Sequence, residues 1–148
     1  MATHTQPQPP RGEILTGPLR TDDEVLARVN EVIGAEERQR QCLWLFFFDR
    51  EMRQMPVAPV IDDVPDQPDP APVANICWIM SQVLADCEPD GFAVIALIRP
   101  GPARSGTIER HWHDALIDGS RRHDTPLRLL CLVTPHDVCE LAPPPHPQ

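Results

Sequence analysis

The chain has 148 residues and a net charge of −9, with 13 basic residues, all of them arginine, against 22 acidic ones. This length suits a single domain with a real core, and an acidic chain repels a phosphate backbone, so no nucleic acid partner is expected. No stretch approaches the roughly 20 apolar residues that span a bilayer, so we expect a cytoplasmic protein that makes no membrane contact.

Proline-rich segments lie at both ends of the chain. Residues 1–18 contain four prolines among polar residues, and residues 142–148 contain four more. Segments of this composition bury too little apolar surface to offset the entropy that is lost when they become ordered. We therefore expect a disordered tail at each end and one folded domain over residues 19–141.

A helix is expected at the start of this domain. Thr21 and Glu24 form a capping-box pattern, in which each side chain can satisfy a backbone amide at the first turn. Apolar residues then recur on one stripe and predict a helix over residues 22–33. The charged run 36–40 after it is expected to be a solvated connection.

A pair of strands is expected next. Residues 42–48 are entirely apolar, which is typical of a central strand that is buried on both faces. Residues 54–61 predict an antiparallel partner for it. Pro56 and Pro59 place this partner at the edge of the sheet, because proline cannot donate a hydrogen bond to a neighbouring strand. An acidic, proline-rich loop over 62–72 follows.

The second half of the chain alternates helical and strand patterns. Apolar residues at three- and four-residue intervals predict two helices, and continuous apolar runs predict strands. The sequence thus predicts an α/β domain of order α-β-β-α-β-α-β-β, with a mixed sheet in a two-layer or three-layer arrangement. The expected elements are helix 73–87, strand 92–98, helix 107–122, strand 127–134 and strand 138–141.

The order and spacing of these elements resemble the RadC-like branch of the JAB/MPN (JAMM) family. The parts that carry the resemblance are Leu43 to Asp49, the helix 73–87, Phe92 to Pro102 and the helix after Thr107. The resemblance implies a JAB-like fold. In active members of the family that fold holds zinc and hydrolyses isopeptide bonds.

The zinc motif of that family is not present in this chain. In the family, a His-x-His-Pro loop is followed by a serine and an aspartate, and the two histidines and the aspartate hold the metal. Aligned on the proline, these four positions are occupied here by Leu97, Arg99, Thr107 and Arg110, and a one-residue gap would place Glu109 at the last of them. Leucine has no lone pair and arginine is a cation, so neither can bind Zn²⁺. The resemblance therefore implies a member without a metal centre, and we assign no catalytic residue, metal ligand or cofactor.

Histidine and cysteine offer few other candidates. His111 and His113 are two residues apart on a predicted helix, so their side chains point about 200° apart and cannot share an ion. The five cysteines form no C-x-x-C pair, and we interpret them as buried free thiols.

Basic residues gather around the turn between strand 92–98 and the following helix. Arg99, Arg104, Thr107 and Arg110 could together bind a phosphate-bearing ligand, with help from the amides at the helix N-terminus. The alternative is that these arginines neutralise the aspartates of the 62–70 loop.

We expect a non-catalytic interaction or regulatory module that binds a protein partner or forms a homodimer. Val57, Ile61 and Trp78 are the expected interface, because an edge strand interrupted by proline leaves apolar surface uncovered. Two other functions stay open. One is a metal-dependent, isopeptidase-like hydrolase with displaced ligands, and the other is a phosphate- or nucleotide-binding domain that uses Arg99 and Arg104.

Overall fold

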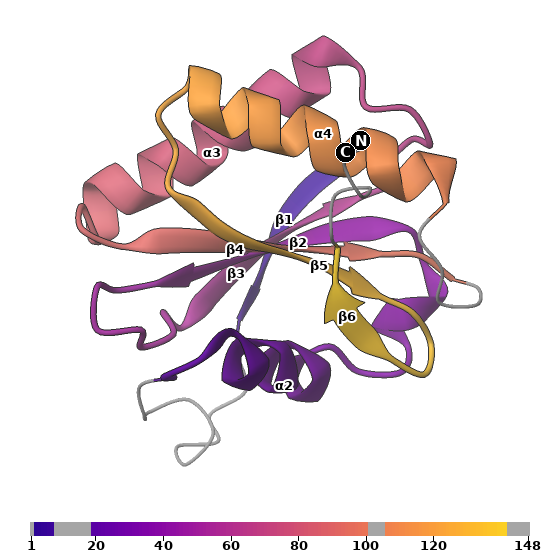
Figure 1. Ribbon diagram of the computed structural model, residues 1–148, viewed down its shortest axis with the longest axis horizontal. Coiled ribbons are helices and arrows are strands. Elements are labelled where there is room, and N and C mark those ends of the chain that lie inside the picture. The colour runs from indigo at the N-terminus through magenta and orange to yellow at the C-terminus, as the bar shows by residue number, and fades with distance from the viewer. Residues whose placement is uncertain (1, 8–18, 101–105, 142–148) are drawn as a thin grey trace, which may run out of the picture.

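The structure is a computed structural model that describes residues 2–7, 19–100 and 106–141. A six-stranded mixed sheet, of order β1-β3-β2-β4-β5-β6, forms the centre of the domain. Two helices cover one face of this sheet and a third covers the other (Figure 1). The elements are β1 (Ala2–Pro7), α2 (Asp22–Val32), the 3₁₀ helix η1 (Glu37–Gln39), β2 (Cys42–Phe48), β3 (Val57–Asp62), α3 (Pro70–Cys87), β4 (Phe92–Ile98), α4 (Thr107–Arg122), β5 (Leu127–Val133) and β6 (Val138–Glu140).

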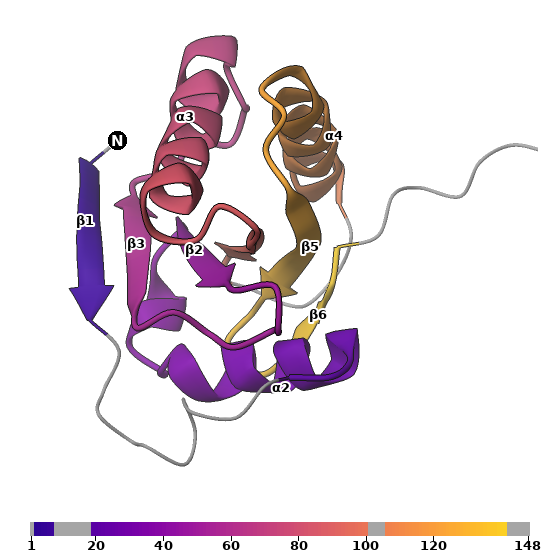
Figure 2. The same ribbon diagram turned by 90° about the vertical axis from the view of Figure 1, so that its left-hand side faces the viewer.

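The three-layer arrangement follows from two apolar strands at the centre of the sheet. β2 and β4 pair antiparallel from Cys42 opposite Ile98 to Phe48 opposite Phe92, and β4 pairs parallel with β5. Every residue of β2 is buried. A strand with this composition needs apolar cover on both faces, which α3 and α4 give on one side and α2 gives on the other (Figure 2).

Two hydrophobic cores result, one on each side of the sheet. Leu43, Leu45 and Phe47 pack into the core beneath α3 and α4. Trp44 and Phe46 alternate with them and pack into the core beneath α2. The alternation is the normal consequence of successive side chains pointing to opposite faces of a strand.

The predicted α/β class, the mixed sheet and the element order from the first helix onward are confirmed. Residues 42–48, 92–98 and 107–122 form the strands and the helix with the expected bounds. Thr21 caps α2 as expected, since its Oγ1 accepts a hydrogen bond from the amide of Glu24 at 3.1 Å.

The expected edge strand is not at the edge, and this prediction was wrong. β1 lies within the segment that we expected to be a disordered tail, and it pairs antiparallel with β3 over the whole of β3. Pro59 does interrupt a ladder, because the pairing of β3 with β2 covers Asp62 to Val60 and stops there, next to Pro59. The tail predicted at 142–148 lies outside the described residues.

Two further expectations are corrected by burial. Arg38 belongs to the run 36–40 that we expected to be solvated, yet it is buried within η1. Ile61 was expected at an interface, but it is buried in the core beneath α3 and α4. The side chain of Val57 lies outside the described part of the structure.

No helix within residues 2–7, 19–100 and 106–141 combines the length and the apolar content that a membrane crossing requires.

Candidate functional site

The turn after β4 contains a partly buried ion pair. Arg99 follows the last residue of β4, and its amide donates to the carbonyl oxygen of Val133 at 3.0 Å. Its side chain turns towards the start of α4, where Nη1 lies 3.2 Å from Oε1 of Glu109. Nη1 is buried and forms this contact without the alignment of a hydrogen bond. Charge neutralisation, rather than directional bonding, therefore holds the two groups together.

The second carboxylate oxygen of Glu109 completes the helix start. Oε2 accepts a hydrogen bond from the amide of Gly106, the N-cap residue of α4, at 2.8 Å. Both oxygens of this buried carboxylate are thus used inside the protein. One caps the helix and the other neutralises Arg99, so the turn is already occupied by an anion of the chain itself.

The residues predicted to bind a phosphate are therefore not presented together. Arg99 is paired with Glu109, while Thr107 and Arg110 are exposed on the first turn of α4. Arg104 lies outside the described residues. An acidic residue does neutralise Arg99, as the alternative expected. That residue is Glu109 rather than an aspartate of the 62–70 loop.

The family positions for zinc ligands have structural roles here. Leu97 is buried in the core beneath α3 and α4, and Arg99 belongs to the ion pair. Within the described ranges, no group of three or more His, Cys, Asp or Glu side chains is placed to hold a metal ion.

The two histidines of α4 face different partners, as their spacing predicts. Nδ1 of His111 lies 3.1 Å from Oε1 of Gln67, and Nδ1 of His113 lies 3.1 Å from Oδ1 of Asp114. His111 therefore belongs to a contact with the loop before α3. His113 is buried and paired locally.

The acidic loop between β3 and α3 is attached by hydrogen bonds to α4 and to Gln41, the residue that precedes β2. Nε1 of Trp112 donates to the carbonyl oxygen of Pro65 at 3.0 Å, and Nε2 of Gln41 donates to that of Val64 at 2.7 Å. Gln67 adds the contact with His111. These bonds hold the loop beside α4, where its last residues form one end of a groove.

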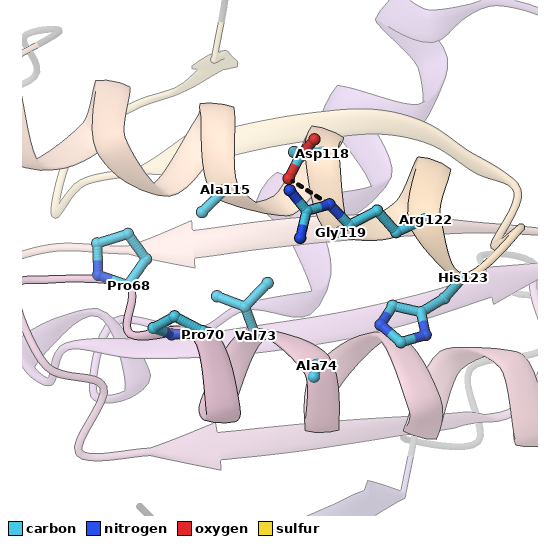
Figure 3. Close-up of a pocket in the computed structure, with 9 residues that line it drawn as sticks. All are labelled: Pro68, Pro70, Val73, Ala74, Ala115, Asp118, Gly119, Arg122 and His123. Atoms are coloured by element: carbon cyan, nitrogen blue, oxygen red, sulfur yellow. Dashed lines mark ion pairs between the residues drawn. The ribbon is translucent and has the colours of Figure 1, made fainter.

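This groove lies on the outer side of the molecule, between α3 and α4 (Figure 3). Its volume is about 260 Å³. Pro68 and Pro70 lie at one end, His123 lies at the other, and Asp118 and Arg122 are joined by an ion pair at 3.0 Å on the α4 side. The lining residues are Pro68, Pro70, Val73, Ala74, Ala115, Asp118, Gly119, Arg122 and His123.

Gly119 determines how closely the two helices approach. A Cβ atom at this position would lie 2.9 Å from Cγ1 of Val73 and 3.0 Å from Sγ of Cys77, which is closer than side chains normally pack. The helices therefore meet through a residue without a side chain, and the apolar floor of the groove lies directly above that contact.

The outer face of α3 is uncharged along almost its whole length. Asp86 is the one charged residue among the 18 residues of this helix, although charged residues make up 24% of the chain. A surface helix normally carries charges on the side that faces water. The exposed residues from Pro70 onward include Ala71, Asn75, Trp78, Gln82 and Ala85.

Trp78 lies in the middle of this face. Its exposed fraction is 59%, and it is the large hydrophobic side chain that stands out as exposed among the described residues. Trp78 follows Ala74 by four residues, so the two side chains are neighbours on the helix surface, about 6 Å apart along the axis. The indole therefore stands beside the groove that Ala74 lines.

Three of the five cysteines are buried and two are exposed, which partly corrects our expectation. Burial raises the pKa of the Cys131 thiol to about 12 and that of Cys42 to about 11. Thiols of this kind are protonated at neutral pH and are poor nucleophiles. The exposed ones are Cys87, at the end of α3, and Cys139, in β6.

Sequence reasoning identified Trp78 and Arg99 but not the groove. Ala115 and Gly119 are small residues of α4, and a small residue on a helix does not reveal whether a neighbouring helix fills the space beside it. Comparisons with protein-family models, with curated proteins and with solved structures each gave no match to this chain.

Proposed function

We propose that this chain is a non-catalytic interaction or regulatory module that binds a protein partner, on a scaffold similar to the JAB/MPN fold. The observation that carries the proposal is the uncharged outer face of α3 with Trp78 exposed at its centre. Tryptophan is enriched among the residues that dominate binding energy at interfaces, and charged residues are depleted there.

The turn after β4 gives further support. In α/β proteins the loops at the carboxyl ends of the strands usually carry the chemistry. Here one carboxylate oxygen of Glu109 pairs with Arg99, and the other accepts a hydrogen bond from the amide of Gly106. A phosphate-bearing ligand would have to displace Glu109 from Arg99, which is unfavourable because it leaves a buried carboxylate unpaired. The phosphate-binding alternative is therefore the weaker one.

The hydrolase alternative also has less support. A zinc-dependent hydrolase needs three protein ligands around an open position. The described part of the chain offers Leu97 and the paired Arg99 at the family's histidine positions, and the two histidines of α4 point to separate partners. We therefore prefer the interaction module.

The proposal can be tested with a photo-crosslinking residue placed at Gln82, which is exposed on the proposed face. A matched control carries the same residue at Asp23, which is exposed on α2, across the sheet. We expect a discrete adduct in cell extract from position 82 only, and loss of that adduct when Trp78→Ala is added.

Binding of the crosslinked partner is then measured with both proteins purified. We expect Trp78→Ala to weaken the Kd at least tenfold, which corresponds to about 1.4 kcal/mol or more. An adduct that survives Trp78→Ala, or that forms equally from position 23, would mean that the face of α3 is not the binding surface.

A further inference from the structure

We infer that the partner of this face is a second copy of the same chain, with Trp78 of each copy inserted into the α3–α4 groove of the other. This inference rests on the proposed function and names its partner. It is drawn from the size of the groove, its position relative to Trp78 and the charge of the surface around both.

The groove has the size for one large side chain. Its volume of about 260 Å³ is below the roughly 300–1,000 Å³ of pockets that bind small molecules. Its floor is apolar, formed by Val73, Ala74 and Ala115. Such a site suits an aromatic anchor, because an indole buries a large apolar area with few rotatable bonds to immobilise.

The anchor and the groove lie on the same side of the molecule. Trp78 is one helical turn from Ala74, which lines the groove. A two-fold axis that passes between them would place each indole over the groove of the other copy. Had the two features been on distant surfaces, the same contact would have produced an open chain of subunits instead of a closed dimer.

The charge pattern favours self-association over a charged partner. Each copy carries a net charge of −9, so two copies repel each other least where the surfaces that meet carry no unpaired acidic residue. The exposed face of α3 from Ala71 to Ala85 meets this condition. A strongly basic partner would be expected to bind an acidic surface, which this face does not offer.

The polar rim of the groove is compatible with an inserted indole. Arg122 and Asp118 neutralise each other through their ion pair, so the rim has no net charge. Their side chains are exposed, and the guanidinium can stack on an aromatic ring that enters the groove. Arg122 is therefore the residue expected to cover the partner's Trp78.

The inference is tested by sedimentation of the purified full-length chain over a range of micromolar concentrations. We expect a dimer for the wild type and at least tenfold weaker association for two variants. Trp78→Ala removes the anchor, and Ala115→Phe fills the groove. Ala27→Phe is the matched control, because Ala27 is exposed on α2, and it should associate as the wild type does.

A mixing experiment separates loss of contact from loss of fold. Trp78→Ala keeps an open groove and Ala115→Phe keeps the anchor, so a mixture restores one of the two reciprocal contacts. We expect the mixture to associate more strongly than either variant alone. If the melting temperature shows that Ala115→Phe does not fold, Ala74→Phe fills the same groove from α3.

Two results would overturn the inference. One is a wild type that stays monomeric throughout, and the other is a dimer that neither Trp78→Ala nor Ala115→Phe weakens. A strict monomer that still gives a Trp78-dependent adduct with a different protein from position 82 would overturn this inference alone. The proposed function would then stand with another partner.

Discussion

The guanidinium of Arg38 joins the end of α2 to the end of β5, with Nη1 donating to the carbonyl oxygen of Thr134 at 3.3 Å. The same group also donates from Nε to the carbonyl oxygen of Ile33 at 3.1 Å and from Nη2 to that of Asn30 at 2.8 Å. The last carbonyl groups of a helix have no partner within the helix. Arg38 supplies those partners and connects the helix to the sheet.

We therefore expect Arg38→Ala to lower the free energy of unfolding by roughly 2–4 kcal/mol, because two buried carbonyl groups and a partly buried one lose their donors at once. The measurement is urea unfolding of both proteins. Arg40→Ala is the control, since Arg40 is exposed, and its effect should lie within about 0.5 kcal/mol. A loss below about 1 kcal/mol for Arg38→Ala would mean that water replaces these hydrogen bonds.

The Arg99–Glu109 pair predicts a coupled effect on stability. Glu109→Gln keeps an acceptor for the amide of Gly106 but leaves the partly buried guanidinium uncompensated, so we expect a loss of about 1–3 kcal/mol. Arg99→Met in the Glu109→Gln background should cost less than it does alone, because no charge is then left unpaired.

A double-mutant cycle in urea measures this coupling directly. We expect an interaction energy of at least about 1 kcal/mol between positions 99 and 109. Arg110→Met with Glu109→Gln is the matched control, since Arg110 is adjacent in sequence but exposed, and its effects should add. If the effects of Arg99→Met and Glu109→Gln on the free energy of unfolding simply add, the ion pair contributes nothing to folding.

The buried thiols predict a loss of stability at alkaline pH. The Cys131 thiol has a pKa of about 12 in the folded protein against 9.0 when unfolded, because burial disfavours the thiolate. The contribution of the protonated Cys131 thiol to the free energy of unfolding is complete below pH 9. It is lost as the pH rises from 9 towards 12, by about 1.4 kcal/mol per pH unit. The chain has neither lysine nor tyrosine, so the other cysteines are the main side chains that titrate in the same range.

We expect the stability of Cys131→Ala to fall less steeply with pH than that of the wild type above pH 9. The measurement is urea unfolding at several pH values between 8 and 10.5 with a reductant present, compared by slope. Cys87→Ser, at an exposed position, should keep the slope of the wild type. Equal slopes for Cys131→Ala and the wild type would mean that the folded thiol titrates normally.

The central strands could be predicted from the sequence because their composition leaves few alternatives. Residues 42–48 and 92–98 contain no polar side chain, and a short apolar run of this kind is typical of a strand that is covered on both faces. The helix over 107–122 was equally clear, since its apolar stripe is regular and Glu109 marks its first turn.

β1 could not be predicted from local pattern. Residues 2–7 lack the alternation of apolar and polar side chains that marks a strand. Their strand conformation depends on backbone pairing with β3, some 55 residues further along the chain. Arg38 was missed for a similar reason. A buried arginine is stable only when several carbonyl groups converge on it, and one of these belongs to Thr134, 96 residues away.

The sequence predicted some residues of the candidate site, but not how their side chains are placed relative to one another. The sequence places Arg99 and Glu109 near the same turn, but it does not reveal that the carboxylate faces the guanidinium rather than solvent. The groove depends on the separation of α3 and α4, which Gly119 sets through its contacts with Val73 and Cys77. Such distances between helices depend on packing and have no local signature.

The pairing of β2 with β4 has a consequence for the register of the sheet. Because both faces of both strands are apolar, a slip by one residue would exchange the side chains of the two cores without exposing a polar group. Size is then what opposes the slip. Trp44 lies opposite Ala96 and Phe46 opposite Val94, whereas a slipped Trp44 would meet Leu97 or Ile95. The correct alignment of these strands is therefore encoded by volume, and substitutions that preserve hydropathy but reverse large and small would favour misaligned sheets.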